Sequence, residues 1–289
     1  MKPAKFAYHA PRSVDQAVRL LAELGDEAKV LAGGQSLVPL MNFRLARPAH
    51  LVDLNRIEDL RVTRVDGELR IGAMTRQRQV ERARDVGARW PLLTEALGLV
   101  GHVQIRNRGT IGGSLAHADP AAELPAVMMA LDAEFTVRSA TGTRAVAATD
   151  FFLGPFTTQL EPTELLTEIH VPDVPPRTGM AFQEVSRRHG DFAIVGVAAL
   201  VTLEEQGPID RARLVFCGAA DRPIRSARAE QALLGRAPDE RLLREASELA
   251  TEDLDPADDV HASAGYRRRV ASVIARRALL QAAQRARET

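Results

Sequence analysis

The chain has 289 residues, 45% of them hydrophobic, and balances 38 lysine and arginine residues against 38 acidic ones. The zero net charge gives no basic footprint for nucleic acid, and the apolar fraction suffices for two or three domain cores. Cys217 is the only cysteine, which excludes a disulfide framework and a four-cysteine iron–sulfur site on this chain. The seven histidines lack metal-ligand spacing, and no apolar run approaches the ~18 residues of a membrane span, so we expect a metal-free, soluble, cytoplasmic chain.

Residues 1–55 predict a small first unit built around a glycine loop. Ser13 is typical of a helix N-cap, and apolar residues at helical spacing follow it until Gly25. Residues 29–32 predict a strand that leads into the loop Ala32-Gly33-Gly34-Gln35-Ser36. A short helix and a strand at 50–54 complete the unit. A strand, a glycine loop and a helix in this order present backbone N–H groups to a phosphate.

Residues 56–175 predict a second unit that contains a similar loop. Hairpins are expected at Asp66-Gly67 and Thr141-Gly142, with helices near 76–83 and 92–100. The loop Thr110-Ile111-Gly112-Gly113-Ser114 comes next, and Asp119-Pro120 predicts the start of a helix that runs to residue 131. Each loop alone can be a simple turn, but two together indicate a diphosphate held from both sides. Neither fits the G-x-G-x-x-G pattern or the P-loop pattern.

Residues 176–289 predict a third unit, which follows a proline-rich linker at 171–177. Long strands are expected at 193–203 and 212–219. Helices are expected at 227–234, at 240–250 and from about residue 263. Strands followed by helices are typical of an α+β domain.

Single residues near these elements have a structural and a functional interpretation. Glu123 lies shortly after the second loop, where a carboxylate is either a solvated helix residue or an acceptor for ribose hydroxyls. Phe192 follows a polar turn and is either a loop anchor or an aromatic face for a planar ring. Cys217 lies in an apolar strand, as an inert core thiol does. No nucleophile–base pair is evident, so we expect no catalytic residue on this chain.

These segments resemble the FAD-binding medium subunit of the molybdenum hydroxylases, the carbon monoxide dehydrogenase and xanthine dehydrogenase group. The resemblance covers essentially the whole chain and rests on residues 32–36, 104–114, 119–125 and 190–193 and on the helical C-terminal domain. It implies an α+β fold in which a two-subdomain FAD-binding domain of the PCMH/vanillyl-alcohol-oxidase-like type precedes an α+β C-terminal domain with an antiparallel sheet and helices.

The resemblance also implies a function within a hetero-oligomeric oxidoreductase. The chain is expected to hold FAD non-covalently, to accept electrons from [2Fe–2S] clusters on a small partner subunit, and to pass them to an external acceptor. A large partner subunit is expected to hold the molybdenum cofactor. Both loops are expected to donate N–H groups to the FAD diphosphate. The implied cofactor-binding residues are Ala32, Gly33, Gly34, Gln35, Ser36, Thr110, Ile111, Gly112, Gly113, Ser114, Glu123, Leu165 and Phe192.

The chain departs from the family pattern at three places. Ser114 stands where relatives commonly have asparagine, Glu123 stands where they usually have aspartate, and Gln183 and Glu184 stand where a lysine is often found. These changes bear on FAD affinity and flavin potential more than on the fold. Two alternatives stay open: a nucleotide-binding enzyme that uses the loops for another phosphate ligand, and a non-catalytic assembly subunit. The substrate, the acceptor and the stoichiometry have no recognisable pattern in this chain.

Overall fold

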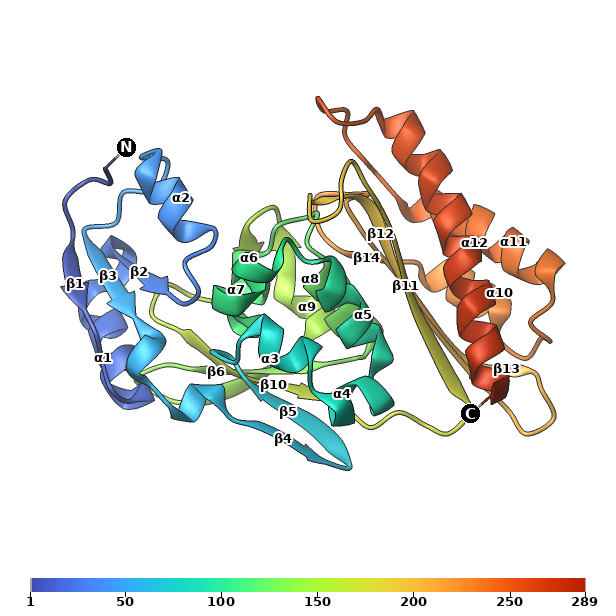
Figure 1. The fold of residues 1–289 in the computed structure, drawn as a ribbon, viewed down its shortest axis with the longest axis horizontal. Helices are drawn as coiled ribbons and strands as arrows, with labels where there is room; N and C mark the ends of the chain where they lie inside the picture. Colours follow the sequence, from blue (N-terminus) through green and yellow to red (C-terminus); the bar gives the residue numbers. More distant parts are fainter. Residues whose placement is uncertain (1, 289) are drawn as a thin grey trace.

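Three β-sheets lie in a row along the long axis of the molecule, in the order of the chain (Figure 1). This computed structural model describes residues 2–288. Helices pack against each of the three sheets, which confirms the predicted α+β class. Within residues 2–288, no helix is long and apolar enough to cross a membrane.

The N-terminal sheet is small and parallel. Its strands, in spatial order, are β1 (Ala7–His9), β3 (His50–Asp53) and β2 (Ala28–Leu31). Parallel neighbours need crossover connections, and the crossovers here contain α1 (Val14–Leu24) and α2 (Leu37–Asn42). The predicted cap of α1 is confirmed, because the Ser13 hydroxyl accepts a hydrogen bond from the Gln16 N–H at 3.2 Å. The first glycine loop therefore connects a strand to a helix, as expected.

The central sheet is antiparallel and contains the predicted hairpins. Its strands, in spatial order, are β4 (Thr63–Asp66), β5 (Glu68–Gly72), β10 (Leu165–Val171), β6 (Glu134–Arg138) and β7 (Thr143–Ala147). The middle strand, β10, has no counterpart among the predicted strands. Before β10 in the chain, β8 (Phe152–Gly154) and β9 (Thr157–Thr158) form a separate two-stranded sheet.

Short helices cover one face of the central sheet (Figure 1). Trp90 is fully buried in their shared core, and its indole N–H donates to the Pro172 carbonyl at 3.0 Å. The helices are α3 (Gln77–Glu81), α4 (Arg84–Arg89), α5 (Pro91–Leu99), α6 (Val103–Arg108), α7 (Ile111–His117), α8 (Glu123–Ala130) and α9 (Ala148–Phe151). Short 3₁₀ turns occur at Gly25–Glu27, Leu54–Arg56, Asp59–Arg61 and Ala250–Asp253.

The C-terminal sheet is antiparallel and is covered on both faces. Its strands are β11 (Thr178–Ser186), β12 (Ala193–Leu203), β13 (Ile209–Cys217) and β14 (Ile224–Arg225). The long helix α12 (Ala264–Glu288) packs on one face, together with α10 (Ala227–Leu233) and α11 (Glu240–Leu249). Helices α5 and α8 pack on the other face. Because both faces are buried, β12 is apolar along almost its whole length.

Side chains bond backbone groups of β11, an edge strand of the C-terminal sheet, and of β13, whose outer neighbour β14 is short. At β11, Glu95 accepts a hydrogen bond from the Phe182 N–H at 3.2 Å and forms an ion pair with Arg285 at 2.6 Å. Arg285 also donates to the Met180 carbonyl. At β13, Glu230 accepts from the Leu214 N–H at 3.1 Å. These three backbone groups are therefore engaged within the chain.

The structure differs from prediction at the start of α8. We expected a helix from Asp119, but α8 begins at Glu123, because the Asp119 carboxylate accepts from the Ala121 N–H at 2.9 Å and closes a separate turn. Strand β11 was not predicted, and the linker at 171–177 instead joins two strands, β10 and β11. The division of the chain at residues 55 and 175 stays a prediction.

Candidate functional site

The first glycine loop, Ala32–Ser36, leaves its amide groups free. The N–H groups of residues 33–36 make no hydrogen bond to another residue that the structure describes. Gly34 has φ of +73°, a left-handed conformation that glycine adopts without strain. The Ser36 hydroxyl, placed at the start of α2, makes no cap bond. Successive free N–H groups on a turn form a concave site for an anion.

The second loop, Thr110–Ser114, is organised differently. It forms the start of α7, and the Thr110 hydroxyl caps this helix by accepting from the Gly113 N–H at 3.0 Å. The N–H groups of Ile111 and Gly112 donate to the Thr75 and Ala73 carbonyls at 3.0 and 2.9 Å. The Ser114 N–H donates to the Thr110 carbonyl at 3.2 Å. The N–H groups of residues 111–114 are therefore already engaged within the chain, and their donation to a diphosphate stays a prediction.

The two loops touch each other through their glycines. A Cβ atom added at Gly33 would lie 2.8 Å from the Gly109 Cα and closer still to the Arg108 carbonyl oxygen. A Cβ atom added at Gly113 would lie 3.3 Å from the Ala32 Cβ. The loops are far apart in the sequence but form one surface, with free N–H groups on one side and the start of α7 on the other.

A hydrogen-bonded tie that we did not predict holds this surface together. The Asn55 side chain donates to the Ala32 carbonyl at 3.0 Å and accepts from the Arg76 guanidinium at 2.6 Å. The same guanidinium donates to the Arg108 carbonyl. Asn55 follows the strand predicted at 50–54, and Arg76 is the first residue of the helix predicted near 76–83, but no local pattern relates them to each other or to the loops.

The tie also concentrates positive charge beside the loops. Burial lowers the pKa of Arg76, and the nearby cations Arg108 and Arg61 lower it further, whereas Asp53 acts in the opposite direction. Burial is the larger cause of the shift, and within residues 2–288 the guanidinium bonds only uncharged groups, the Asn55 side chain and the Arg108 carbonyl. A diphosphate would supply the missing negative charge.

The other predicted residues lie in different surroundings. Leu165 is buried in the N-terminal hydrophobic core, where its neighbours include Val52 and Met74. Phe192 is 62% exposed at the start of β12, in the polar turn where Gly190 contacts the His102 ring. Glu123 begins α8, and its side chain is buried without a hydrogen bond to another described side chain. Burial, followed by the charge of Glu184, raises the pKa of Glu123 to about 8.

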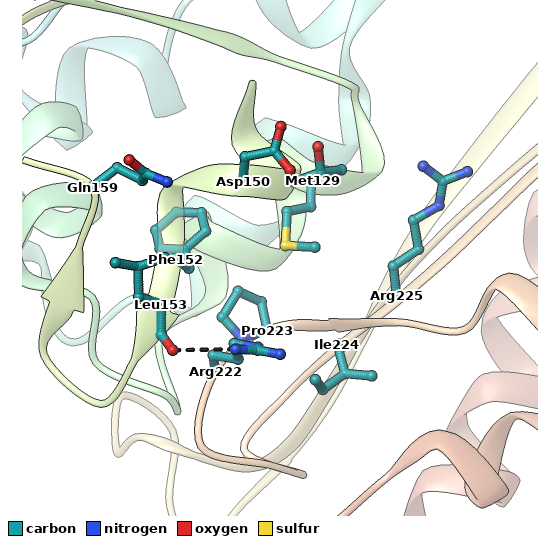
Figure 2. Close-up of a pocket in the computed structure, with 10 residues that line it drawn as sticks. Met129, Asp150, Phe152, Leu153, Gln159, Arg222, Pro223, Ile224 and Arg225 are labelled. Carbon is teal, nitrogen blue, oxygen red and sulfur yellow. Dashed lines mark hydrogen bonds between the residues drawn. The ribbon is translucent and has the colours of Figure 1, made fainter. Parts of the chain in front are cut away.

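A surface cavity of about 520 Å³ lies apart from the predicted residues (Figure 2). It opens between the segment around β8 and the segment before β14, where Arg222 donates to the Leu153 carbonyl at 3.1 Å. None of the predicted cofactor-binding residues lines it. Its lining residues are Met129, Thr149, Asp150, Phe152, Leu153, Gln159, Arg222, Pro223, Ile224 and Arg225.

The candidate metal ligands of the described residues form no site. Within residues 2–288, no group of three or more His, Cys, Asp or Glu is placed to hold a metal ion. Cys217 is fully buried, and burial raises the pKa of its thiol. It is a core thiol, as expected.

Two family models match successive parts of the chain. The model described as the FAD binding domain in molybdopterin dehydrogenase matches residues 4–174. The model described as the CO dehydrogenase flavoprotein C-terminal domain matches residues 180–282. The free N–H groups of residues 33–36 and the Arg76 guanidinium therefore lie within the part of the chain that matches the FAD-binding family model.

Individual relatives match over the whole chain. The 6-hydroxypseudooxynicotine dehydrogenase complex subunit alpha of Paenarthrobacter nicotinovorans is 46% identical and covers 100% of this chain and 98% of its own length. Among solved structures, a chain of the Hydrogenophaga pseudoflava carbon monoxide dehydrogenase has a TM-score of 0.95, 41% identity and 98% coverage of both chains. A chain of quinoline 2-oxidoreductase from Pseudomonas putida 86 has a TM-score of 0.93, 40% identity and 99% coverage of both. The chain belongs to the FAD-binding medium subunits of the molybdenum hydroxylases, of the carbon monoxide dehydrogenase and xanthine dehydrogenase type.

Proposed function

We propose that this chain holds FAD non-covalently, receives electrons from [2Fe–2S] clusters on a small partner subunit and passes them to an external acceptor. A large partner subunit holds the molybdenum cofactor. The observation that carries the proposal is the joined surface of the two loops, with free N–H groups at residues 33–36 beside the Arg76 guanidinium, which bonds the uncharged Asn55 side chain and Arg108 carbonyl. This surface is complementary to a diphosphate.

Each part of the proposed site has a separate task. The amides of residues 33–36 and the Ser36 hydroxyl bind phosphate oxygens, and hydrogen bonds to such charged acceptors are about twice as strong as neutral ones. The start of α7 forms the opposite wall, where the Ser114 hydroxyl is free to contact the cofactor. Glu123 and Phe192 would contact the cofactor as well, and Leu165 lies in the hydrophobic cluster that Ala32 of the first loop packs against. When bound, FAD supplies a carrier that accepts and releases electrons, and the chain positions it and tunes its surroundings.

The relatives suggest that the substrate is chosen elsewhere. Carbon monoxide dehydrogenase and quinoline 2-oxidoreductase are named for chemically unrelated substrates, yet their chains match this one equally well along its length. A chain whose fold is kept between such enzymes is suited to a shared step. We propose that this step is electron transfer in the cytoplasm, without an essential general base on this chain.

The test begins with the visible absorption spectrum of the purified chain after incubation with FAD and desalting. We expect flavin bands at about one equivalent and release of the flavin on heating, because no covalent bond holds it. The electron-transfer step is then tested in the complex with both partner subunits, where substrate is expected to bleach the flavin bands under anaerobic conditions. A chain that stays colourless even in the complex would support the assembly or other-nucleotide alternatives instead.

A further inference from the structure

Two carboxylates face each other between the FAD domain and the C-terminal sheet. Along β11, Met180 and Phe182 belong to the core beneath the FAD-domain helices, whereas Ala181 belongs to the core under α12. Glu184 follows this alternation and therefore faces the FAD domain. Its neighbour Gln183 faces the other way and bonds Gln281 of α12 at 2.7 Å.

The opposing carboxylate is Glu123, at the start of α8. This helix packs on β12 and β13, and the Pro120 carbonyl before it accepts from the Gly218 N–H at 2.8 Å, which fixes the turn to the end of the sheet. Glu184 pairs in register with Gly196, and Gly196 pairs with Cys217. Gly196 has no side chain, and the Cys217 Sγ and the Phe182 ring fill the position above it, because an added Cβ atom would lie 2.6 Å from the former and 3.1 Å from the latter.

No cation balances the two carboxylates. Neither forms an ion pair with any residue that the structure describes, and Glu184 Oε2 is buried without a hydrogen-bond partner. The groups that face them are Asp119 from the turn before α8, Ser186 from β11 and the Cys217 thiol from β13. Burial raises the pKa of Glu123 to about 8 and that of Glu184 to about 7.

The other end of α8 shows that this arrangement is not forced by the fold. Asp132, just beyond the helix, is bonded by Arg211 and by Arg213 at 2.8 Å, and Arg225 lies 3.7 Å away. The pKa of Asp132 is lowered by these cations despite burial. At the boundary between the FAD domain and the C-terminal sheet, Asp132 therefore has three arginines beside it, whereas Glu123 and Glu184 have no arginine partner among the described residues.

The pair is connected to the second loop through two helices in contact. Helix α7 begins in that loop and contacts α8, whose first residue is Glu123. Where protein replaces water, charges are screened less than in salt solution, in which the Debye length is about 8–10 Å.

We propose that Glu123 and Glu184 hold one proton between them at neutral pH and take up a second when the bound flavin is reduced. The step forms one O–H bond on a carboxylate oxygen with a proton from solvent, and the electrons come from the iron–sulfur partner of the proposed function. The driving force is electrostatic, because added negative charge nearby favours the neutral form of a carboxyl group. This inference rests on FAD binding as proposed above.

The first test is the flavin midpoint potential as a function of pH, in the wild-type chain and in the E184Q and E123Q variants. One extra proton per two electrons changes the equilibrium tenfold per pH unit, which is about 30 mV per pH unit for a two-electron couple. We expect the wild-type potential to fall more steeply than that of either variant between about pH 6.5 and 8.5, by up to this amount. The exposed turn residue Glu205 provides the control, E205Q, which should keep the wild-type slope. Equal slopes in wild type and both variants would overturn the proposal.

The second test needs no flavin. The free energy of unfolding of the apo chain is measured against pH by urea titration, and the wild type should lose stability from pH 5 to 8 more steeply than E184Q or E123Q. Equal pH dependence in all three proteins means that no shared proton exists and refutes the inference. If the wild type binds no FAD while this difference is present, the proposed function fails and the proton pair stands alone.

Discussion

Replacing Gly33 with alanine tests the contact between the two glycine loops. The backbone at Gly33 is not left-handed, so alanine adds no conformational strain of that kind. The new methyl group would lie 2.8 Å from the Gly109 Cα and closer to the Arg108 carbonyl, whereas ordinary contacts of a Cβ are 3.4–4 Å. Both neighbours are backbone atoms that no rotamer change can move, so the loops must separate by several tenths of an ångström or more.

The expected cost follows from that overlap. Overpacking of a close contact typically costs about 1–3 kcal/mol, and the same energy taken from FAD affinity corresponds to about a 5–150-fold increase in Kd. We expect G33A to weaken FAD binding within this range and to lower the melting temperature of the apo chain. The assays are FAD titration followed by flavin fluorescence and thermal unfolding of the apo protein.

A matched control comes from the hairpin of β6 and β7. A Cβ atom at Gly142 would meet no heavy atom within 4 Å, and the backbone there is also not left-handed. G142A should therefore keep wild-type affinity and stability. A G33A variant whose Kd and melting temperature match those of G142A would refute the argument that loop contact positions the phosphate-binding amides.

Three further predictions concern charge. R76A should raise the FAD Kd about tenfold or more, because it removes both the tie to the Arg108 carbonyl and a cation beside the loops. Fluorescence titration with FAD at two salt concentrations measures this Kd. An unchanged Kd contradicts the proposed site. D132N should lower the free energy of unfolding of the apo chain by about 1–3 kcal/mol, measured by urea unfolding, because three arginines lose a partly buried partner. It should leave the FAD Kd unchanged, because Asp132 is not part of the proposed site. The pKa of Glu123 is about 8 in the folded chain and 4.5 in the unfolded chain, so the native state binds more protons between these pH values. The free energy of unfolding should therefore fall as the pH rises through this window, by up to about 1.4 kcal/mol per pH unit, and then level off. At pH 8, E123Q should accordingly be more stable than the wild type, and a less stable E123Q would contradict the assigned cause.

Local signals predicted much of the fold. The Ser13 cap, the Asp66-Gly67 turn and the apolar run of β12 depend on neighbours within a few residues, and the structure contains all three as expected. Strands β10 and β11 were missed because their polar and apolar residues do not alternate cleanly and a linker separates them. The partners of β10, which are β5 and β6, come from distant parts of the chain, whereas β11 pairs with the next strand, β12.

The candidate site was predictable in part. The glycine loops are visible as sequence motifs. The N–H groups of the second loop, however, bond the carbonyls of Ala73 and Thr75, which lie more than thirty residues before it in the sequence. The tie between Asn55 and Arg76 and the approach of Glu184 to Glu123 join segments whose spacing carries no pattern. Such relations arise from tertiary packing, which local sequence reasoning does not reach.

Side-chain bonds to β11 and β13 limit how an extended segment can add to the C-terminal sheet. An open strand edge invites any extended segment, because backbone hydrogen bonding is blind to side-chain identity. Here the Phe182 N–H, the Met180 carbonyl and the Leu214 N–H are already bonded to Glu95, Arg285 and Glu230. A strand added at these positions would have to displace those side chains, so strand addition there is disfavoured.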